Sequence, residues 1–123
     1  MYRLSVDQRF CAAHRIVNYP GNCASMHGHT YSVRAVVASN ALDVLGMIID
    51  IRKLKEIIAD SVAHFDHKDL NSLPEFQEIN PTAENIARIL YKQIQIKISK
   101  WQNLILESVS VSEGVDNLVT YSE

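Results

Sequence analysis

Two segments near the start of the chain alternate apolar and polar side chains, a pattern typical of strands with one buried face. The apolar residues of the first segment are Tyr2, Leu4, Val6 and Phe10. The alternation returns over residues 29–37, and residues 18–26 between the two segments contain a Pro-Gly pair and two asparagines, which favour a loop. The pattern therefore predicts an antiparallel hairpin.

The middle of the chain changes to helical periodicity, with apolar residues three or four positions apart. Asp50 can cap a first helix that ends near residue 65. Pro81 and Thr82 open a second helix that ends near residue 99. The segment between the helices is polar and contains Pro74, so it is interpreted as a connection.

The end of the chain predicts two more strands, over residues 104–113 and 117–121, joined by a short turn. The order ββααββ predicts an α+β fold, in which a four-stranded antiparallel sheet carries both helices on one face. The uncovered face and two free edges of such a sheet favour association with neighbours in an oligomer. The length of 123 residues predicts one domain, residues 1–123.

Composition narrows the class of protein. The chain is 47% hydrophobic and 21% charged, as expected for a folded globular protein, and its net charge of -2 gives no general attraction to nucleic acid or anionic membranes. No apolar run reaches the ~18 residues that span a bilayer, and the start lacks the apolar block of a signal peptide. We therefore expect a cytoplasmic protein with two free thiols.

Three histidines form the first candidate site. His27 and His29 lie two positions apart at a strand start, so their side chains point to the same side, and the hairpin brings His14 opposite them. Three histidines without a fourth protein ligand are typical of catalytic zinc, whose open position takes water or substrate. Three unrelated histidines are an equal alternative on spacing alone.

The two cysteines receive different interpretations. Cys23 lies four residues before His27 in the polar loop, where a metal ion would favour a thiolate able to act as base or nucleophile. An incidental loop cysteine is the simpler alternative. Cys11 lies in the first strand between Phe10 and Ala12 and is interpreted as a small buried hydrophobe.

Two acidic positions complete the candidate chemistry. Asp66 precedes His67 after the first helix, and an adjacent carboxylate can orient an imidazole for proton transfer, although a solvated turn explains the pair as well. Glu113 ends a predicted strand on the same side as Val111, which directs its carboxylate toward a cleft. A salt bridge at the strand end is the alternative for Glu113.

Six segments in order resemble the 6-pyruvoyltetrahydropterin synthase family. They are Phe10-Cys-Ala-Ala-His14, Cys23-x-x-x-His27-Gly-His29, Gly46-Met-Ile-Ile-Asp50, Asp66-His67, Asn80-Pro-Thr-Ala-Glu84 and Val111-Ser-Glu113. Together they cover most of the chain and are specific in combination. The three residues between Cys23 and His-Gly-His resemble the 6-carboxytetrahydropterin synthase branch, which feeds queuosine and other deazapurines.

The resemblance implies a tunnelling fold, in which sheets of neighbouring subunits join into a barrel and two trimers stack into a homohexamer. Active sites then lie between subunits. The implied zinc ligands are His14, His27 and His29. The other implied roles are Cys23 as proton acceptor, Asp66 and His67 as its relay, Glu113 as the acid that anchors the pterin ring and takes part in catalysis, and Thr82 as a helix-start position near the pocket.

The implied reaction is a carbon-carbon lyase reaction that converts 7,8-dihydroneopterin triphosphate into 6-carboxy-5,6,7,8-tetrahydropterin, acetaldehyde and triphosphate. Zinc would acidify the side-chain hydroxyls while the bases move protons. The candidate cations for the triphosphate are Arg9, Arg15 and Lys68. Sister reactions on the same scaffold, pyruvoyltetrahydropterin formation or aldolase-like cleavage, and a non-catalytic zinc-binding module are the alternatives.

Overall fold

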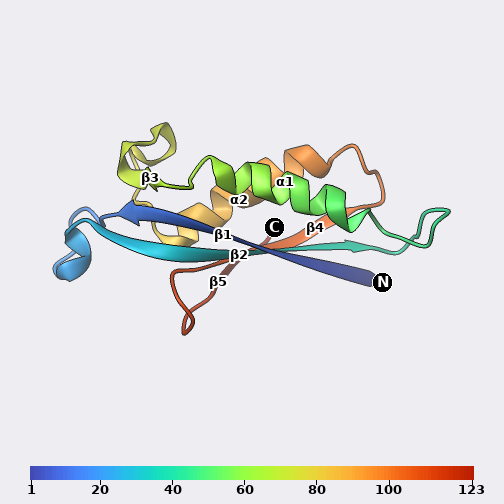
Figure 1. Cartoon of the computed structure of the whole chain (residues 1–123), viewed down its shortest axis with the longest axis horizontal. Coiled ribbons are helices and arrows are strands. Elements are labelled where there is room, and N and C mark those ends of the chain that lie inside the picture. Colours follow the sequence, from blue (N-terminus) through green and yellow to red (C-terminus); the bar gives the residue numbers. More distant parts are fainter.

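The computed structural model describes all 123 residues, which form one twisted sheet with two helices on one of its faces (Figure 1). Its centre is an antiparallel hairpin of β1 (Tyr2–His14) and β2 (His27–Ser39). The pairing runs without interruption from Tyr2 opposite Ser39 to His14 opposite His27. The predicted hairpin is therefore confirmed, and it is long enough to include the histidines themselves.

The remaining elements follow the predicted order with one addition. They are α1 (Ile51–Ala63), β3 (Lys68–Asp69), α2 (Ala83–Ile98), β4 (Ile105–Ser112) and β5 (Val119–Tyr121). The sheet order is β3-β1-β2-β4-β5, and β3 runs parallel to β1. The predicted four-stranded antiparallel sheet is thus a five-stranded mixed sheet. β3 was missed because its two residues are both exposed and carry no apolar alternation.

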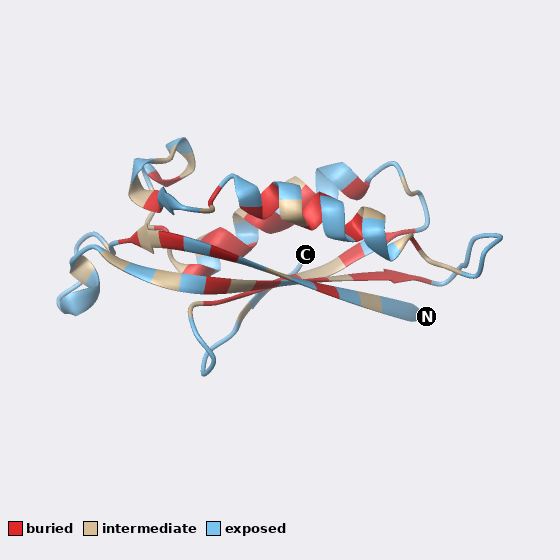
Figure 2. Ribbon diagram, viewed as in Figure 1, coloured by how far each residue is buried: buried red, intermediate tan, exposed pale blue.

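Asp50 caps α1 as predicted, and α2 begins at the predicted position with Thr82 as its cap. The Asp50 carboxylate accepts a hydrogen bond from the Arg52 amide at 2.8 Å, and the Thr82 hydroxyl accepts one from the Asn85 amide at 3.2 Å. Each helix then buries one face against the sheet (Figure 2). Neither helix combines the length and apolar character that crossing a membrane would require.

The core lies between the helices and the even-numbered face of β1. Phe10 and Tyr31 stack there with ring centroids 4.7 Å apart, and both are almost completely buried. Because side chains alternate along a strand, Cys11 points to the opposite, uncovered face and is exposed. Its interpretation as a buried hydrophobe was wrong. Tyr2, also predicted on the buried face, is 52% exposed because β1 extends beyond the helices at that end.

The outer edge of β1 is largely unpaired. On the side away from β2, only Ala12 and Ala13 pair with another strand, β3. Along most of this 13-residue strand, the backbone groups that point away from β2 are therefore not paired with another strand. The uncovered sheet face is polar and holds the ion pairs Arg3–Glu107 and Arg34–Asp7, at 2.8 and 2.7 Å.

Candidate functional site

The three predicted histidines meet at the loop end of the β1–β2 hairpin. His14 closes β1, His27 begins β2 directly opposite it, and His29 lies two residues further on the same face. One ligand atom from each residue lies within 4.8 Å of the other two. The imidazole rings meet edge to face, with centroids 4.6–5.0 Å apart. This grouping favours a shared ligand over three unrelated side chains.

Backbone carbonyls orient two of the rings. His14 Nδ1 lies 2.7 Å from the Pro81 carbonyl oxygen, and His27 Nδ1 lies 2.7 Å from that of Ser25. A carbonyl can only accept, so each Nδ1 carries a proton, and Nε2 is the nitrogen of each ring that remains for a metal ion. Metal-binding histidines are commonly held in this way. Sequence reasoning missed Pro81 and Ser25 because a backbone carbonyl leaves no signal in residue type.

Two of the histidine nitrogens that face the centre of the cluster are buried and have no hydrogen-bond partner. His14 is 1% exposed, and the Nε2 atoms of His14 and His29 are buried without a hydrogen bond. Desolvation by burial lowers the pKa of His14, which favours the neutral ring that a metal ion requires. Buried polar atoms without partners are rare, so these atoms fit a site for a metal ion.

Glu113 lies at the same centre. It follows the last residue of β4, and its two carboxylate oxygens lie 3.8 Å from His14 Nε2 and 3.6 Å from His29 Nε2. A cavity of about 280 Å³ opens beside it. The cavity is lined by Ala83, Glu84, Val111, Glu113, Asn117 and Val119. The structure therefore places this acid in a cleft and also next to the histidines, a contact that spacing along the chain did not indicate.

The start of α2 supports the cluster from the helix side. Thr82 caps α2 directly after Pro81, the residue whose carbonyl orients His14. The Asn80 side chain bonds both backbone groups of Val17, at 2.9 and 3.1 Å, which ties the β1–β2 loop to the same segment. Thr82 is thus adjacent in sequence to the residue that contacts His14, which places the start of α2 near the pocket.

Tyr31 extends the site into the core. Its ring centroid lies 5.4 Å from that of His29 and 5.8 Å from that of His14, and its buried hydroxyl has no hydrogen-bond partner. Burial raises the pKa of this phenol, and the nearby Glu113 carboxylate raises it further. Tyr31 therefore stays neutral and keeps a proton to donate. From the sequence it was only part of the alternating segment of residues 29–37.

Cys23 and the Asp66–His67 pair are not bonded to each other within the chain. Cys23 occupies a one-turn 3-10 helix, is exposed, and has its carbonyl bonded to the Ile16 amide. No hydrogen bond or ion pair joins it to Asp66 or His67. The His67 amide instead bonds the Cys11 carbonyl of β1.

Asp66 and His67 do form a pair with each other. His67 Nδ1 lies 3.0 Å from Asp66 Oδ1, and the same carboxylate oxygen accepts the Cys11 amide at 2.9 Å. That hydrogen bond is the main reason that the pKa of Asp66 lies below its ordinary value, so the carboxylate is charged at neutral pH. The His67 side chain is 80% exposed. The pair is available at the sheet edge, and its hydrogen bonds within the chain go to Cys11 and not to Cys23.

The candidate phosphate-binding cations remain free. None of Arg9, Arg15 and Lys68 forms an ion pair within the chain. Arg9 faces the uncovered side of the sheet, Arg15 follows the histidine-bearing end of β1, and Lys68 belongs to β3 beside it. The structure therefore does not select one of the three.

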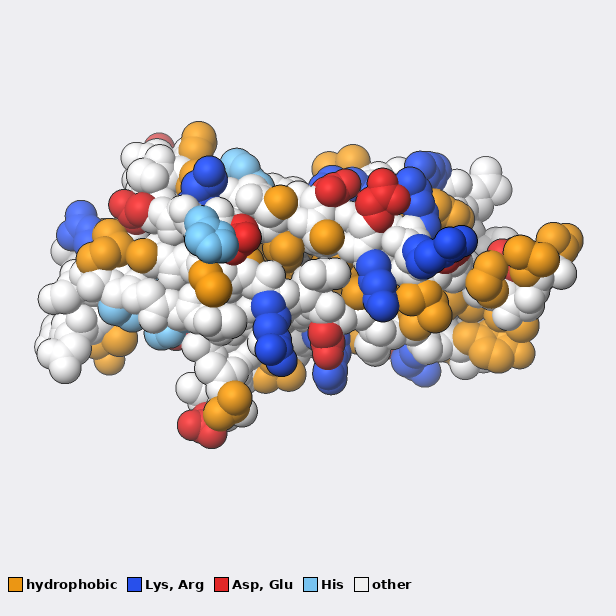
Figure 3. Space-filling model, viewed as in Figure 1, with side chains coloured by type: hydrophobic (Ala, Val, Ile, Leu, Met, Phe, Trp, Pro, Cys, Tyr) orange, Lys and Arg blue, Asp and Glu red, His pale blue; other side chains and the backbone are white.

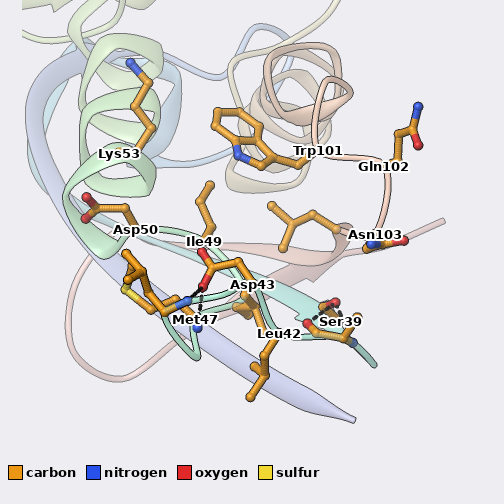
Figure 4. Close-up of a pocket in the computed structure, with 14 residues that line it drawn as sticks. Ser39, Leu42, Asp43, Met47, Ile49, Asp50, Lys53, Trp101, Gln102 and Asn103 are labelled. Atoms are coloured by element: carbon orange, nitrogen blue, oxygen red, sulfur yellow. Dashed lines mark hydrogen bonds between the residues drawn. The ribbon is translucent and has the colours of Figure 1, made fainter.

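A cavity of about 430 Å³ lies at the other end of the sheet (Figure 4). It is formed by the loop after β2, the start of α1 and the segment around Trp101. The Asp43 carboxylate points to the backbone amides of Leu45 and Met47, and Asp50 caps α1. None of the predicted site residues lines it, so this cavity is not the candidate site.

Comparison with known proteins gives a consistent family. A sequence model of the family described as 6-pyruvoyl tetrahydropterin synthase matches residues 3–123. The chain is 31% identical over 121 residues to the 6-carboxy-5,6,7,8-tetrahydropterin synthase of Rickettsia felis, with 85% of this chain and 88% of that protein covered. The family model extends over all the predicted site residues.

Two further matches show the range of activities on this scaffold. The dihydroneopterin monophosphate aldolase of Pyrococcus furiosus is 34% identical over 114 residues, covering 93% of this chain and 88% of that protein. The structure of 6-pyruvoyl tetrahydropterin synthase from Caenorhabditis elegans superposes with a TM-score of 0.87 at 24% identity, covering 99% of this chain and 95% of that one. The second match shows that the fold is the same.

Proposed function

Because the chain belongs to the 6-pyruvoyl tetrahydropterin synthase family, we propose that it is a zinc-dependent 6-carboxy-5,6,7,8-tetrahydropterin synthase of queuosine and deazapurine synthesis. The proposed substrate is 7,8-dihydroneopterin triphosphate, and the products are 6-carboxytetrahydropterin, acetaldehyde and triphosphate. The observation that carries the proposal is the meeting of three imidazoles and the Glu113 carboxylate beside a cavity.

The histidine cluster is the proposed zinc site. His14, His27 and His29 offer three nitrogens, which is the ligand set of a catalytic zinc with an open position. Bound zinc would supply a Lewis acid that lowers the pKa of the substrate's side-chain hydroxyls. The Pro81 and Ser25 carbonyls keep two of the ligands in the required tautomer.

Glu113 is the proposed anchor of the pterin ring. The amino group and adjacent N–H of a pterin form a flat, guanidine-like edge, to which a carboxylate can make two parallel charge-assisted hydrogen bonds. The cavity beside Glu113 has a volume of about 280 Å³ and mixes apolar and polar walls. An anchored ring would place its side chain toward the histidines, 3.6–3.8 Å from the same carboxylate.

Cys23 is the proposed proton acceptor, with Asp66 and His67 as its relay. Cys23 is exposed four residues before His27, while the relay lies at the outer edge of β1. Since no hydrogen bond or ion pair joins them within one chain, we propose that the relay of one subunit completes the site of its neighbour. This arrangement needs an oligomer.

Two features support assembly into a homohexamer built as two trimers. The outer edge of β1 is unpaired along most of its length, and such an edge favours pairing with a strand of another chain. Hydrophobic side chains also gather at the end of the molecule opposite the histidines (Figure 3). The exposed hydrophobic residues at that end are Met1, Tyr2, Leu42, Val44, Leu45 and Ile51.

Product analysis tests the function. We expect the purified zinc protein to release acetaldehyde and triphosphate in equal amounts from 7,8-dihydroneopterin triphosphate, with 6-carboxytetrahydropterin identified by mass spectrometry. A pyruvoyl product without acetaldehyde would identify the sister synthase, and side-chain cleavage without a carboxyl product would identify aldolase-like activity. Zinc binding without any consumption of substrate would indicate a non-catalytic module.

Metal analysis tests the ligands. We expect about one zinc per chain in the unmodified protein and loss of most of it in His27→Ala, because two imidazoles hold the ion much less tightly than three. His64→Ala is the matched control, since His64 pairs with Glu75 away from the cluster. Retention of stoichiometric zinc by His14→Ala, His27→Ala and His29→Ala alike would remove the proposed site.

A further inference from the structure

The contact between Glu113 and the histidines is not a hydrogen bond. Glu113 Oε1 lies 3.8 Å from His14 Nε2, and Glu113 Oε2 lies 3.6 Å from His29 Nε2. The donor and acceptor of an N–H···O hydrogen bond are about 2.7–3.2 Å apart. His14 Nδ1 is already engaged by the Pro81 carbonyl, which can only accept. His14 Nε2 therefore turns toward a Glu113 oxygen at a distance too long for a direct hydrogen bond.

A cation between these atoms resolves the arrangement. Zinc holds nitrogen and oxygen ligands at about 2.0–2.2 Å, which places two ligands of one tetrahedral ion roughly 3.3–3.5 Å apart. The observed separations of 3.6 and 3.8 Å are only slightly longer. The Nε2 atoms of His14 and His29 also have no hydrogen-bond partner in the structure. The distances from the Glu113 carboxylate to His14 Nε2 and His29 Nε2 are therefore close to those expected between two ligands of the same zinc ion.

We propose that Glu113 is the fourth ligand of the metal ion in the substrate-free protein. The site then has three imidazoles and one carboxylate before substrate arrives. Glu113 lies just outside β4 at the start of a turn, and its side chain is 36% exposed, so the carboxylate has space to rotate away. Ligation by Glu113 closes the position that a substrate needs.

The second part of the proposal rests on the proposed function. The pterin ring and the metal ion compete for one carboxylate, so binding of the ring releases Glu113 and opens the metal to the side chain of the same substrate. The metal thereby becomes reactive only when a pterin occupies the cavity. Ring recognition and metal opening are coupled through a single side chain.

Metal affinity without substrate tests the ligand. We expect Glu113→Gln to weaken zinc binding in a chelator competition by at least the roughly 10–100-fold that loss of an outer-shell partner costs, because a carboxylate ligand is replaced by a neutral amide. Glu84→Gln is the matched control: it removes the same charge from the same cavity, but Glu84 makes no contact with the histidines. We expect Glu84→Gln to bind zinc like the unmodified protein. Equal affinities in all three proteins would overturn the proposal.

The visible spectrum of the cobalt-substituted protein tests the exchange. We expect 7,8-dihydropterin, a pterin ring without a side chain that could bind metal, to change the cobalt bands of the unmodified protein and not those of Glu113→Gln. Unchanged bands at saturating dihydropterin would overturn the exchange. Because neither measurement needs turnover, a protein that leaves dihydroneopterin triphosphate unconsumed would contradict the proposed function and not the fourth ligand.

Discussion

Turnover is expected to fall about 10²–10⁴-fold in Cys23→Ala, the cost typical of losing a general base. The variant should retain zinc, because Cys23 lies in the loop before the histidines and is not one of the clustered ligands. It should also retain pterin binding, which is assigned to Glu113. Acetaldehyde release, metal content and dihydropterin affinity, measured on one preparation, check the three expectations.

Cys11→Ala supplies the matched control for the thiol. Cys11 is the other free cysteine, and its side chain lies on the uncovered face of the sheet, opposite to the histidines. We expect its replacement to leave turnover near that of the unmodified protein. If Cys23→Ala releases acetaldehyde at the unmodified rate, the thiol is a bystander and the proposed proton transfer is wrong.

Mixing two inactive variants is expected to restore activity. Cys23→Ala and His67→Ala each break every site of their own oligomer, because the proposed site takes Cys23 from one chain and His67 from its neighbour. When equal amounts are unfolded together and reassembled, about a quarter of the interfaces should pair an intact Cys23 with an intact His67. Turnover per site should therefore recover to about a quarter of the unmodified value.

A second mixture controls for nonspecific recovery. Cys23 and His27 belong to the same loop and strand start, so a mixture of Cys23→Ala with His27→Ala contains no chain in which that half of the site is complete. It should remain inactive. Light scattering should find about six chains per particle in each mixture. Activity from the first mixture no higher than from the second would contradict a relay supplied by the neighbouring subunit.

The elements that the sequence predicted well are those whose signal is local. Alternation over β1 and β2 and helical spacing over α1 and α2 reflect burial of one face, which residue type records directly. The caps at Asp50 and Thr82 depend on a side chain within three residues of its partner, so they were also predictable. β3 carries no such pattern, because only its hydrogen bonds to β1 define it.

The sequence also determined the membership of the histidine cluster. A His-x-His pair at a strand start and a histidine at the end of the preceding strand must meet once the hairpin forms, because the two-residue period of a strand fixes the side to which they point. The same period decides that Cys11 faces away from Phe10. That error came from weighing the apolar character of its neighbours above the alternation.

Only the tertiary structure decided the surroundings of that cluster. The Pro81 carbonyl, 67 positions from His14, and the Glu113 carboxylate reach the histidines through the packing of α2 and β4 against the hairpin. The position of His67 at the edge of β1 likewise follows from where β3 joins that strand. Contacts between distant segments depend on how whole elements pack, and no local pattern of residue types encodes them.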